Sequence, residues 1–485
     1  MTDPKIQAVK EFFPPTANDK ARLGNYNYFE QLFLGQHFEA FAIKIDSQQY
    51  KKDYARLKYV ACNFAGLLSK VMADMLFSEP PTISTEEGDQ EFLDNLAWEN
   101  KLQVQFYESA LGNSYFGDGL FKVRIGKRRA VDPKPTVIIE DITPKIYFPN
   151  IDGYNVRQEP DKITLAWTLK IGDKEYLRKE IHEPRKIHNE LWLLKGNEIA
   201  AQANISELGI EGLQEEEDTK IDDLLVIHVP NWKTGATHFG ISDYNDLTSL
   251  FYAINNRMTK TENILDKHSD PILALPEGVL DEEGQVKKSQ LHMFEVPDGA
   301  GDKAKPEYIV WNASLENNFK HIEKLVEMLF MTSEVSPDIL GMGQGQSESG
   351  RALKLKLLRT IAKSQRKRLY YDHAIKQTLL VAQRLAKAHG AQVMGKTLSG
   401  EPVVPDLEWM DGIPIDEMEQ VELEEKKIDA GLTSKEDAIM RIEGVDEDVA
   451  KEKAKKIKEE TAIAMPEAGS FGKNPFGGKP PLGGK

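Results

Sequence analysis

The sequence predicts an α+β protein that is mostly helical. Long segments place apolar residues at helical spacing, and residues 136–195 hold short runs of strand-forming residues between turn residues such as Gly172-Asp173. A third observation refines this class, because two long amphipathic helices flank a small β-rich insert. A compact domain is rarely built in this way, so we expect a helical hairpin that carries a tip.

The first half of the chain is expected to begin with helices and to continue with strands. Residues 55–77 have helical spacing of apolar side chains, and the proline pair at 80–81 ends this helix because proline lacks the N–H donor. A second helix is expected over roughly 92–112, followed by a strand. Residues 200–222 are acidic and weakly patterned, which indicates a loop. The other predicted strands are 137–142, 145–150, 162–171, 175–182, 190–196 and 224–231.

The helical hairpin is predicted over residues 241–332. Its first helix runs from Ile241 to His268 with Asp243 as a candidate N-cap, and its second helix covers about 314–332. Short strand-like pieces in the insert between them are 272–276, 291–297 and 307–311. The residues predicted to pack the two helices together are Leu250, Ile254, Met258, Phe319, Ile322 and Val326.

A glycine-rich loop and a third long helix follow the hairpin. Pro337 breaks the second helix, and residues 333–350 are expected to form a flexible linker. The third helix is predicted from about Ser347 to His389 and is strongly basic over 351–368. Its apolar residues are expected to be buried, namely Leu353, Leu355, Leu357, Leu358 and Ile361.

The cations of the third helix have two interpretations. The favoured one is structural: much of the charge is simply solvated, or it pairs with the acidic residues around 401–425, in the same subunit or in a neighbouring one. The other is contact of residues 351–368 with DNA or another partner.

The C-terminal part is expected to hold two short polar helices and a tail. The helices are predicted at 416–429 and 434–462, and Ser434 and Asp437 have the spacing of a capping box. The tail, 465–485, is rich in Gly, Pro and Lys, which predicts disorder.

Composition limits the classes of function. The formal net charge of −16 argues against nonspecific binding to nucleic acid or to acidic membranes. The single cysteine, Cys62, excludes an internal disulfide and is expected to be a buried, inert thiol. The first residues lack an apolar core of signal-peptide length, and no window approaches the ~18 apolar residues of a membrane span. We therefore expect a soluble protein that is made and used in the cytoplasm.

No motif nominates an enzyme, so no catalytic residue, metal site or cofactor is expected. The glycines at 341, 343 and 345 precede a helix, but they follow another helix and lack the lysine of a phosphate-binding loop. His182 and His188 do not have the spacing of a zinc motif, and Pro184 between them would break the helix that this motif requires. A flexible linker and polar residues at strand edges are the simpler interpretations.

Four stretches, taken in order, resemble the portal proteins of tailed double-stranded DNA phages, the family with wing, stem, clip and crown regions. They are NFAGLLSKVMADMLFSEPPTI at 63–83, GISDYNDLTSLFYAINNRMTKTENILDKHSDPIL at 240–273, LGMGQGQSESGRALKLKL at 340–357 and AGLTSKEDAIMRIEGVDEDVAKEKAKKIKEE at 430–460. Each stretch is only moderately specific, but an unrelated protein would have no reason to reproduce their order and spacing. The resemblance covers most of residues 55–460.

The resemblance implies a phage portal fold with a wing, a helical stem, a small α/β clip, a tunnel loop and a helical crown, assembled as a ring. Residues 1–240 would form the wing, with its β-rich part at 115–231, and 351–414 would add the long helix and the rest of the wing. The remaining parts would be stem helices at 241–269 and 313–333, the clip at 270–312, the tunnel loop at 334–350, the crown at 415–462 and a disordered tail at 463–485.

The same resemblance implies a function. The chain would be the head–tail connector of a phage virion, a ring of about twelve subunits at one capsid vertex through which double-stranded DNA is packaged and ejected. The protein would lie in the virion, and in the host cytoplasm during assembly. Its partners would be further copies, double-stranded DNA, the large terminase subunit, a head–tail adaptor, the major capsid protein and, as a further candidate, a scaffolding protein, with no membrane.

The residues expected to face the DNA belong to the tunnel loop. They are Met342, Gly343, Gln344, Gly345, Gln346, Ser347 and Glu348.

Two rival interpretations remain. A scaffold or adaptor protein without a DNA channel would use the helical hairpin to bind a partner. An enzyme, such as a nucleotide-dependent motor subunit or a nuclease, would need the phosphate-binding lysine or clustered carboxylates with histidine, and the sequence offers neither.

Overall fold

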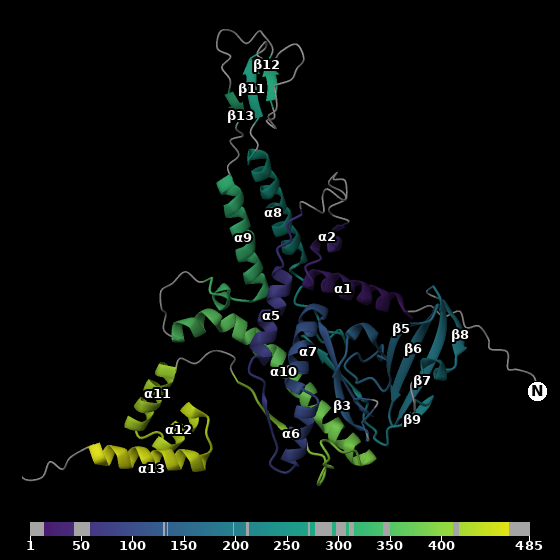
Figure 1. Cartoon of the computed structure of the whole chain (residues 1–485), viewed down its shortest axis with the longest axis vertical. Coiled ribbons are helices and arrows are strands. Elements are labelled where there is room, and N and C mark those ends of the chain that lie inside the picture. The colour runs from purple at the N-terminus through teal and green to yellow at the C-terminus, as the bar shows by residue number, and fades with distance from the viewer. Residues whose placement is uncertain are drawn as a thin grey trace, which may run out of the picture. The chain divides into compact units, whose positions relative to one another are not determined.

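The computed structural model describes most of the chain (Figure 1). The described residues are 14–42, 59–129, 131–132, 134–196, 198–209, 213–269, 272–276, 293–296, 307–309, 315–342, 350–410 and 417–464. They fall into two compact units. The larger unit consists of Met1–Gln346 and Lys354–Gly412, and the smaller unit consists of Ser347–Leu353 and Ile413–Lys485. The larger unit mixes helices and sheets, as the sequence predicts.

Helices open the larger unit. They are α1 (Ala17–Phe33), α2 (His37–Ala40), α5 (Phe64–Phe77), α6 (Gln90–Glu99) and α7 (Leu102–Phe116). Of the helix predicted over 55–77, residues 55–58 lie outside the described part, and α5 begins at Phe64, where the side chain of Asn63 caps it by accepting a backbone hydrogen bond at 2.9 Å. The helix predicted over 92–112 is two helices, because Lys101 between them adopts a left-handed backbone conformation with φ of 51°.

The strands of the larger unit form antiparallel sheets beside these helices. Their bounds are β1 (Thr82–Ser84), β2 (Asp118–Gly126), β3 (Thr136–Asp141), β4 (Tyr147–Pro149), β5 (Ile163–Ile171), β6 (Lys174–Glu183), β7 (Lys186–Lys195), β8 (Glu198–Ala203), β9 (Glu216–Asp218), β10 (Val226–Pro230) and β14 (Asp406–Glu408). One sheet has the order β10-β2-β3, another has the order β4-β5-β6-β7-β8 with β9 on β7, and β1 pairs with β14. The predicted strands are confirmed.

The loop predicted over 200–222 is wrong in part. β8 reaches Ala203, a short 3-10 helix covers Ile205–Leu208, and β9 adds an acidic strand to β7. The side chain of Asn189 on β7 donates hydrogen bonds to the Gln214 carbonyl and to Glu217, both at 2.7 Å. Pairing with β7 is a tertiary interaction, so the local composition gave no sign of this strand.

The helical hairpin is present with its small sheet. α8 (Thr248–Ser269) and α9 (Leu315–Ser333) flank β11 (Ile272–Pro276), β12 (Met293–Val296) and β13 (Glu307–Ile309), and α10 (Gly350–His389) follows them. Strand β11 is parallel to β12 and antiparallel to β13. The predicted helices and strand pieces are confirmed, but α8 begins at Thr248 and not at Ile241. Asp243 is therefore not its N-cap.

Of the hydrophobic clusters among the described residues of the larger unit, two are much larger than the others. One joins α5, α6, α7, β2, β3, β10 and α10 through buried residues such as Phe77, Phe106 and Tyr371. The other joins α1, α5, the first turns of α8 and the end of α9, with Phe251 and Leu329 fully buried. The core thus anchors the base of the hairpin.

The smaller unit is helical in its described part. Its helices are α11 (Glu417–Asp429), α12 (Lys435–Glu443) and α13 (Glu447–Ala464). The capping box is confirmed, because Ser434 accepts the N–H of Asp437 at 3.0 Å and the Asp437 carboxylate bonds back. The single helix predicted over 434–462 is wrong, since Gly444 ends α12 in a left-handed conformation with φ of 63°.

A buried cluster of histidine, tyrosine and aspartate attaches α1 to the strands. Asp118 accepts the Tyr26 hydroxyl at 2.6 Å and lies 2.7 Å from Nε2 of His228. The rings of His228 and His238 stack with centroids 4.8 Å apart, and the Tyr147 hydroxyl lies 3.1 Å from Nε2 of His238. Burial, followed by the neighbouring His228, lowers the pKa of His238 to about 4.

We expect acid to weaken this attachment. The pKa of His238 is lower in the folded chain than its ordinary value of 6.5, so its neutral form stabilises the fold at neutral pH, and this contribution is lost as the pH falls from 6.5 toward 4. The loss should be about 1–2 kcal/mol between pH 7 and pH 5. Denaturant titrations at both pH values should show a smaller acid loss for His238→Gln than for the wild type. His321→Gln on the exposed side of α9 is the control, and equal acid sensitivity of all three proteins would contradict this prediction.

Candidate functional site: the helical hairpin and the contacts at its base

The hairpin helices α8 and α9 pack against each other, and Figure 1 shows the small sheet of β11, β12 and β13 beyond their far ends. Of the six residues predicted to pack the two helices, four belong to one hydrophobic cluster, namely Leu250, Ile254, Met258 and Val326. Ile322 is half-buried outside that cluster, and Phe319 is 45 % exposed. The packing role of these last two residues stays a prediction.

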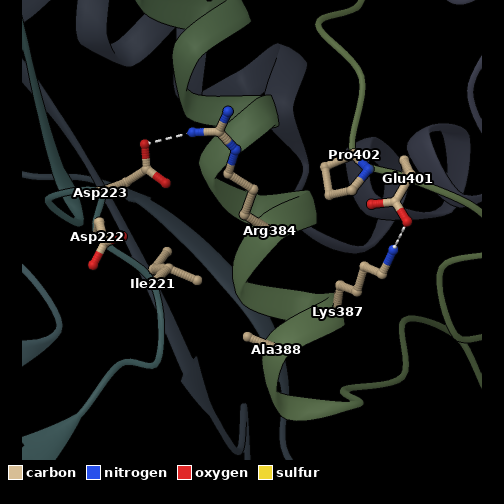
Figure 2. Close-up of a pocket in the computed structure, with 8 residues that line it drawn as sticks. All are labelled: Ile221, Asp222, Asp223, Arg384, Lys387, Ala388, Glu401 and Pro402. Atoms are coloured by element: carbon tan, nitrogen blue, oxygen red, sulfur yellow. Dashed lines mark hydrogen bonds and ion pairs between the residues drawn. The ribbon is translucent and has the colours of Figure 1, made fainter.

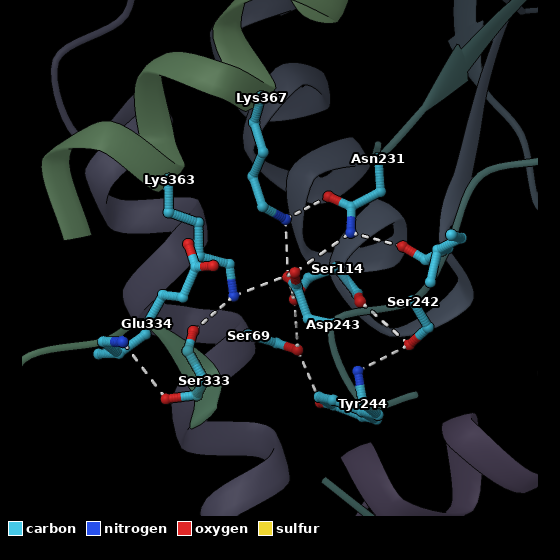
Figure 3. Close-up of polar contacts among 12 residues, drawn as sticks. Ser69, Ser114, Asn231, Ser242, Asp243, Tyr244, Ser333, Glu334, Lys363 and Lys367 are labelled. Atoms are coloured by element: carbon cyan, nitrogen blue, oxygen red, sulfur yellow. Dashed lines mark hydrogen bonds and ion pairs between the residues drawn. The ribbon is translucent and has the colours of Figure 1, made fainter. Parts of the chain in front are cut away.

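A buried ion-pair network lies at the base of the hairpin (Figure 3). Asp243, in the segment between β10 and α8, has a side chain that is only 3 % exposed. Its carboxylate lies 3.1 Å from Nζ of Lys363 and 2.6 Å from Nζ of Lys367, both on α10. Ser114 at the end of α7 donates its hydroxyl to this carboxylate at 2.7 Å, and Asn231 donates its amide at 3.2 Å. The network therefore joins α7, the start of the hairpin and α10.

The electrostatics of the network depend on all its members. Burial alone would raise the pKa of Asp243, but the two ammonium groups outweigh burial and hold this pKa far below its ordinary value. Burial lowers the pKa of Lys367 to about 8, against the attraction of Asp243. The Asp243 carboxylate pairs with both ammonium groups, and each lysine also donates a hydrogen bond to a second oxygen. Lys363 donates to the Ser333 carbonyl at 2.9 Å, and Lys367 donates to the Asn231 side chain. Removing one member would leave a buried charge without compensation.

A second set of contacts, the clamp, holds the end of α9 to α10. It consists of Glu334, Ser336, Arg359, Thr360 and Arg366. Glu334 adopts a left-handed conformation with φ of 59°, which turns the chain at the end of α9. Its carboxylate lies 2.9 Å from Arg366 and 3.2 Å from Arg359. Thr360 accepts the N–H of Ser336 at 2.8 Å and donates to the Glu334 carbonyl at 3.3 Å. The clamp and the network together tie both ends of the hairpin to one helix.

Most cations in the basic part of α10 thus form ion pairs within the larger unit. Five of its cations lie within ion-pair distance of acidic residues, namely Lys356, Arg359, Lys363, Arg366 and Lys367. The predicted structural pairing is confirmed for these five. Their partners within the larger unit are Asp243, Glu334 and Asp338, so the predicted pairing with the acidic residues around 401–425 stays a prediction. The segments that enter and leave the hairpin fold back onto α10, which local sequence does not reveal.

The apolar residues of α10 also differ from the prediction. Leu357 is 5 % exposed, and Ile361 packs against the core, as expected. Leu355 and Leu358, however, are 67 % and 58 % exposed, and Leu353 is 37 % exposed. Successive helical residues lie about 100° apart, so five closely spaced apolar residues cannot all share one face.

The predicted tunnel loop, 334–350, is described up to Met342 and again at Gly350, and Met342 alone among the residues predicted to face DNA belongs to this described part. Met342 is described, and its side chain is 57 % exposed. The other six residues lie outside the described part, namely Gly343, Gln344, Gly345, Gln346, Ser347 and Glu348. Their role facing DNA therefore stays a prediction.

An open depression of about 660 Å³ lies beside the second half of α10 (Figure 2). Its lining is Ile221, Asp222, Asp223, Arg384, Lys387, Ala388, Glu401 and Pro402. Arg384 lies 2.7 Å from Asp223, and Lys387 lies 2.6 Å from Glu401. Both cations of the lining are thus paired with carboxylates of the lining, and the lining contains no cysteine, serine or histidine, so it offers none of these common nucleophiles or bases.

The histidines and the cysteine that the sequence analysis weighed as candidate ligands or nucleophiles do not come together in a site. His182 and His188 lie on the neighbouring strands β6 and β7, so they cannot form a helical zinc motif. Cys62 is half-buried, and burial raises the pKa of its thiol, which makes it less reactive. Across the part of the chain that the structure describes, no group of three or more potential metal ligands occurs. None of the described helices combines the length and apolar character needed to cross a membrane.

Sequence reasoning missed the ion-pair network as a unit. Lys363 and Lys367 are one turn apart, on the helix face that also carries the buried Thr360 and Ser364. Two lysines on a buried face require an acidic partner, and this signal was available in the sequence. It does not identify Asp243, which is 120 residues away from Lys363 along the chain.

Comparison with known proteins gives one family match. The sequence model of the family described as phage portal protein, SPP1 Gp6-like, matches residues 15–467. Among solved structures, a chain in the "Neck of native GTA particle computed with C12 symmetry" is similar with a TM-score of 0.43 and 12 % identity, covering 80 % of this chain and 92 % of that chain. A chain in the "Virion of native gene transfer agent (GTA) particle" gives a TM-score of 0.38 and 12 % identity over 78 % and 89 %. No curated protein matches.

Proposed function

The chain belongs to the phage portal proteins of the SPP1 Gp6-like family, and we propose that it forms the ring-shaped channel through which double-stranded DNA enters and leaves a capsid at one vertex. The observation that carries this proposal is the family match over residues 15–467. A portal, head–tail connector role follows from membership of this family. The DNA channel, the binding partners and the location in the virion are parts of the proposal.

We assign the parts of the chain as in the sequence-based expectation. α8 and α9 are the stem, and β11, β12 and β13 belong to the clip, which binds first the large terminase subunit and then the head–tail adaptor. The sheets and most helices of the larger unit form the wing, and α11, α12 and α13 form the crown. Residues 334–350 are the tunnel loop. The order of the elements supports this assignment, since it is the order that the family resemblance implies.

The mechanism requires no catalytic residue in this chain. DNA must slide through the channel, so the channel surface should hold phosphates weakly, and a ring multiplies each contact by the number of subunits. The acidic composition of the chain, with a net charge of −16, suits this requirement. The network of Asp243 and the clamp support a rigid stem base, because they tie the hairpin to α10 at both of its ends. The ATPase of the packaging motor is expected to be a separate polypeptide.

Imaging of the purified protein tests the proposal directly. We expect native mass measurements and negative-stain images to show rings of about twelve subunits with a central hole of about 20–40 Å, wide enough for a duplex. A monomer or a closed dimer under conditions of virion assembly would contradict the proposal and would favour an adaptor without a channel. ATPase or nuclease activity in the pure protein would contradict the non-catalytic role.

A further inference from the structure

The first half of α10 is apolar on two opposite faces. The inner face lies in the core of the larger unit, with Leu357 5 % exposed and Tyr371 1 % exposed. On the opposite side, residues 355, 358, 362 and 369 fall on one face of a helix with 3.6 residues per turn. We call this face the outer leucine stripe. It consists of Leu355, Leu358, Ala362 and Leu369, and its three leucines are 67 %, 58 % and 73 % exposed.

A helix that is apolar on both sides is normally covered on both sides. The core covers the inner face, but no described residue of the larger unit covers the outer leucine stripe, as the exposed fractions show. From Leu355 to Leu369 the stripe is about 21 Å long, because each helical residue adds about 1.5 Å. A stripe of this length matches the contact that another protein surface makes with one helix.

The charge of the segment around the outer leucine stripe indicates what kind of surface it would bind. The segment 350–371 holds eight Lys and Arg and no Asp or Glu. The rest of the chain holds all 78 acidic residues and the other 54 basic ones, a net charge of −24. A second copy of this chain therefore offers a predominantly acidic surface to a helix whose flanks are basic.

We propose that the outer leucine stripe binds a second copy of this chain, the neighbouring subunit of the ring. This inference rests on the proposed portal function, because a ring requires each subunit to contact its neighbours through two different faces. The stripe is one of these faces, and an apolar surface with acidic residues on the next subunit is the other. The buried cations of α10 then hold the helix to its own subunit, while the leucines of the outer leucine stripe contact the neighbouring subunit.

DNA fits this face less well. The phosphates of a duplex bind cationic side chains, and exposed leucines form no favourable contact with phosphates. Five of the eight cations in the segment are already paired inside the chain, among them Lys363 and Lys367, which are buried. The observation thus favours the subunit contact among the two interpretations of the basic helix.

The test is the full-length double variant Leu355→Glu/Leu358→Glu. Both side chains are exposed, so the variant should keep the circular dichroism spectrum and thermal midpoint of the wild type. The protein concentration at which half the subunits form rings, measured by mass photometry, should rise at least about 100-fold. The matched control is Val131→Glu/Tyr154→Glu, which changes two exposed apolar residues elsewhere (85 % and 103 % exposed) and should form rings like the wild type.

A crosslinking measurement keeps the inference testable if the double variant fails to fold. In Cys62→Ser/Leu358→Cys, the new thiol is the only one in the chain and can carry a benzophenone group. Irradiation of rings should give covalent dimers and higher ladders, whereas the same label in Cys62→Ser/Tyr154→Cys should give few.

The outcomes separate this inference from the proposed function. Rings of the wild type together with equally stable rings of the double variant, or a label at 358 that crosslinks only within one subunit, would overturn the inference alone. A double variant that keeps its rings but no longer retains a DNA duplex would also overturn it, and so would wild-type binding to anionic vesicles that the double variant loses. A wild type that forms no rings under any condition of assembly would overturn the proposed function first.

Discussion

Replacing Asp243 with alanine is expected to lower the free energy of unfolding of the larger unit by about 3–5 kcal/mol. The substitution leaves the ammonium groups of Lys363 and Lys367 buried without their carboxylate, and these side chains are 7 % and 2 % exposed. It also removes the acceptor of the Ser114 hydroxyl. Denaturant titration of the purified protein, followed by tryptophan fluorescence, measures the change.

Two further variants identify the cause. Asp222→Ala is the matched control, because Asp222 is an aspartate whose side chain is 84 % exposed and lies 3.9 Å from Arg185, and it should change stability by less than about 0.5 kcal/mol. Adding Lys363→Met and Lys367→Met to Asp243→Ala should recover much of the lost stability, since no buried charge then lacks a partner. If the triple variant were no more stable than Asp243→Ala, the loss would come from packing and not from the uncompensated cations.

The second large effect is expected from Gln344→Lys/Gln346→Lys, and it rests on the proposed function. With about twelve subunits, the double variant would add about 24 cations to the channel, and each cation near a phosphate strengthens the hold on DNA. We expect the yield of filled capsids in an in vitro packaging reaction to fall at least about tenfold. Because this attraction is screened by salt, higher ionic strength should partly restore packaging.

An uncharged pair distinguishes charge from loop shape. Gln344→Ala/Gln346→Ala should package nearly as well as the wild type. If the lysine variant left both the packaging rate and the packaged length unchanged, these residues would not be DNA contacts. If the alanine variant failed as badly as the lysine variant, loop conformation and not charge would limit packaging.

The sequence predicted the parts of the fold that depend on neighbouring residues. Helical spacing located α5, α9 and α10, turn residues located the strands from β2 to β7, and the capping box at Ser434 marked the start of α12. These signals are local, because a period of 3.6 or 2 and a cap four residues long need no information about distant segments. The family resemblance rests on the order of the same local signals.

Boundaries were less predictable where one residue overrides a pattern. Lys101 separates α6 from α7, and Gly444 separates α12 from α13, although apolar spacing continues on both sides. Both residues adopt a left-handed conformation, with φ of 51° and 63°. The periodicity of side chains does not report the backbone conformation of a single residue.

The sequence by itself determined the family, the class of fold, and the hairpin with its β-rich tip. Only the tertiary structure decided that Asp243 is a buried partner of Lys363 and Lys367, where the sequence suggested a helix cap. It also decided which leucines of α10 are buried, since Leu357 faces the core and Leu358 faces outward at 58 % exposure. The physical reason is the same in both cases. A charge or an apolar side chain shows that a partner is needed, but the chain must fold before it is known which distant segment supplies that partner.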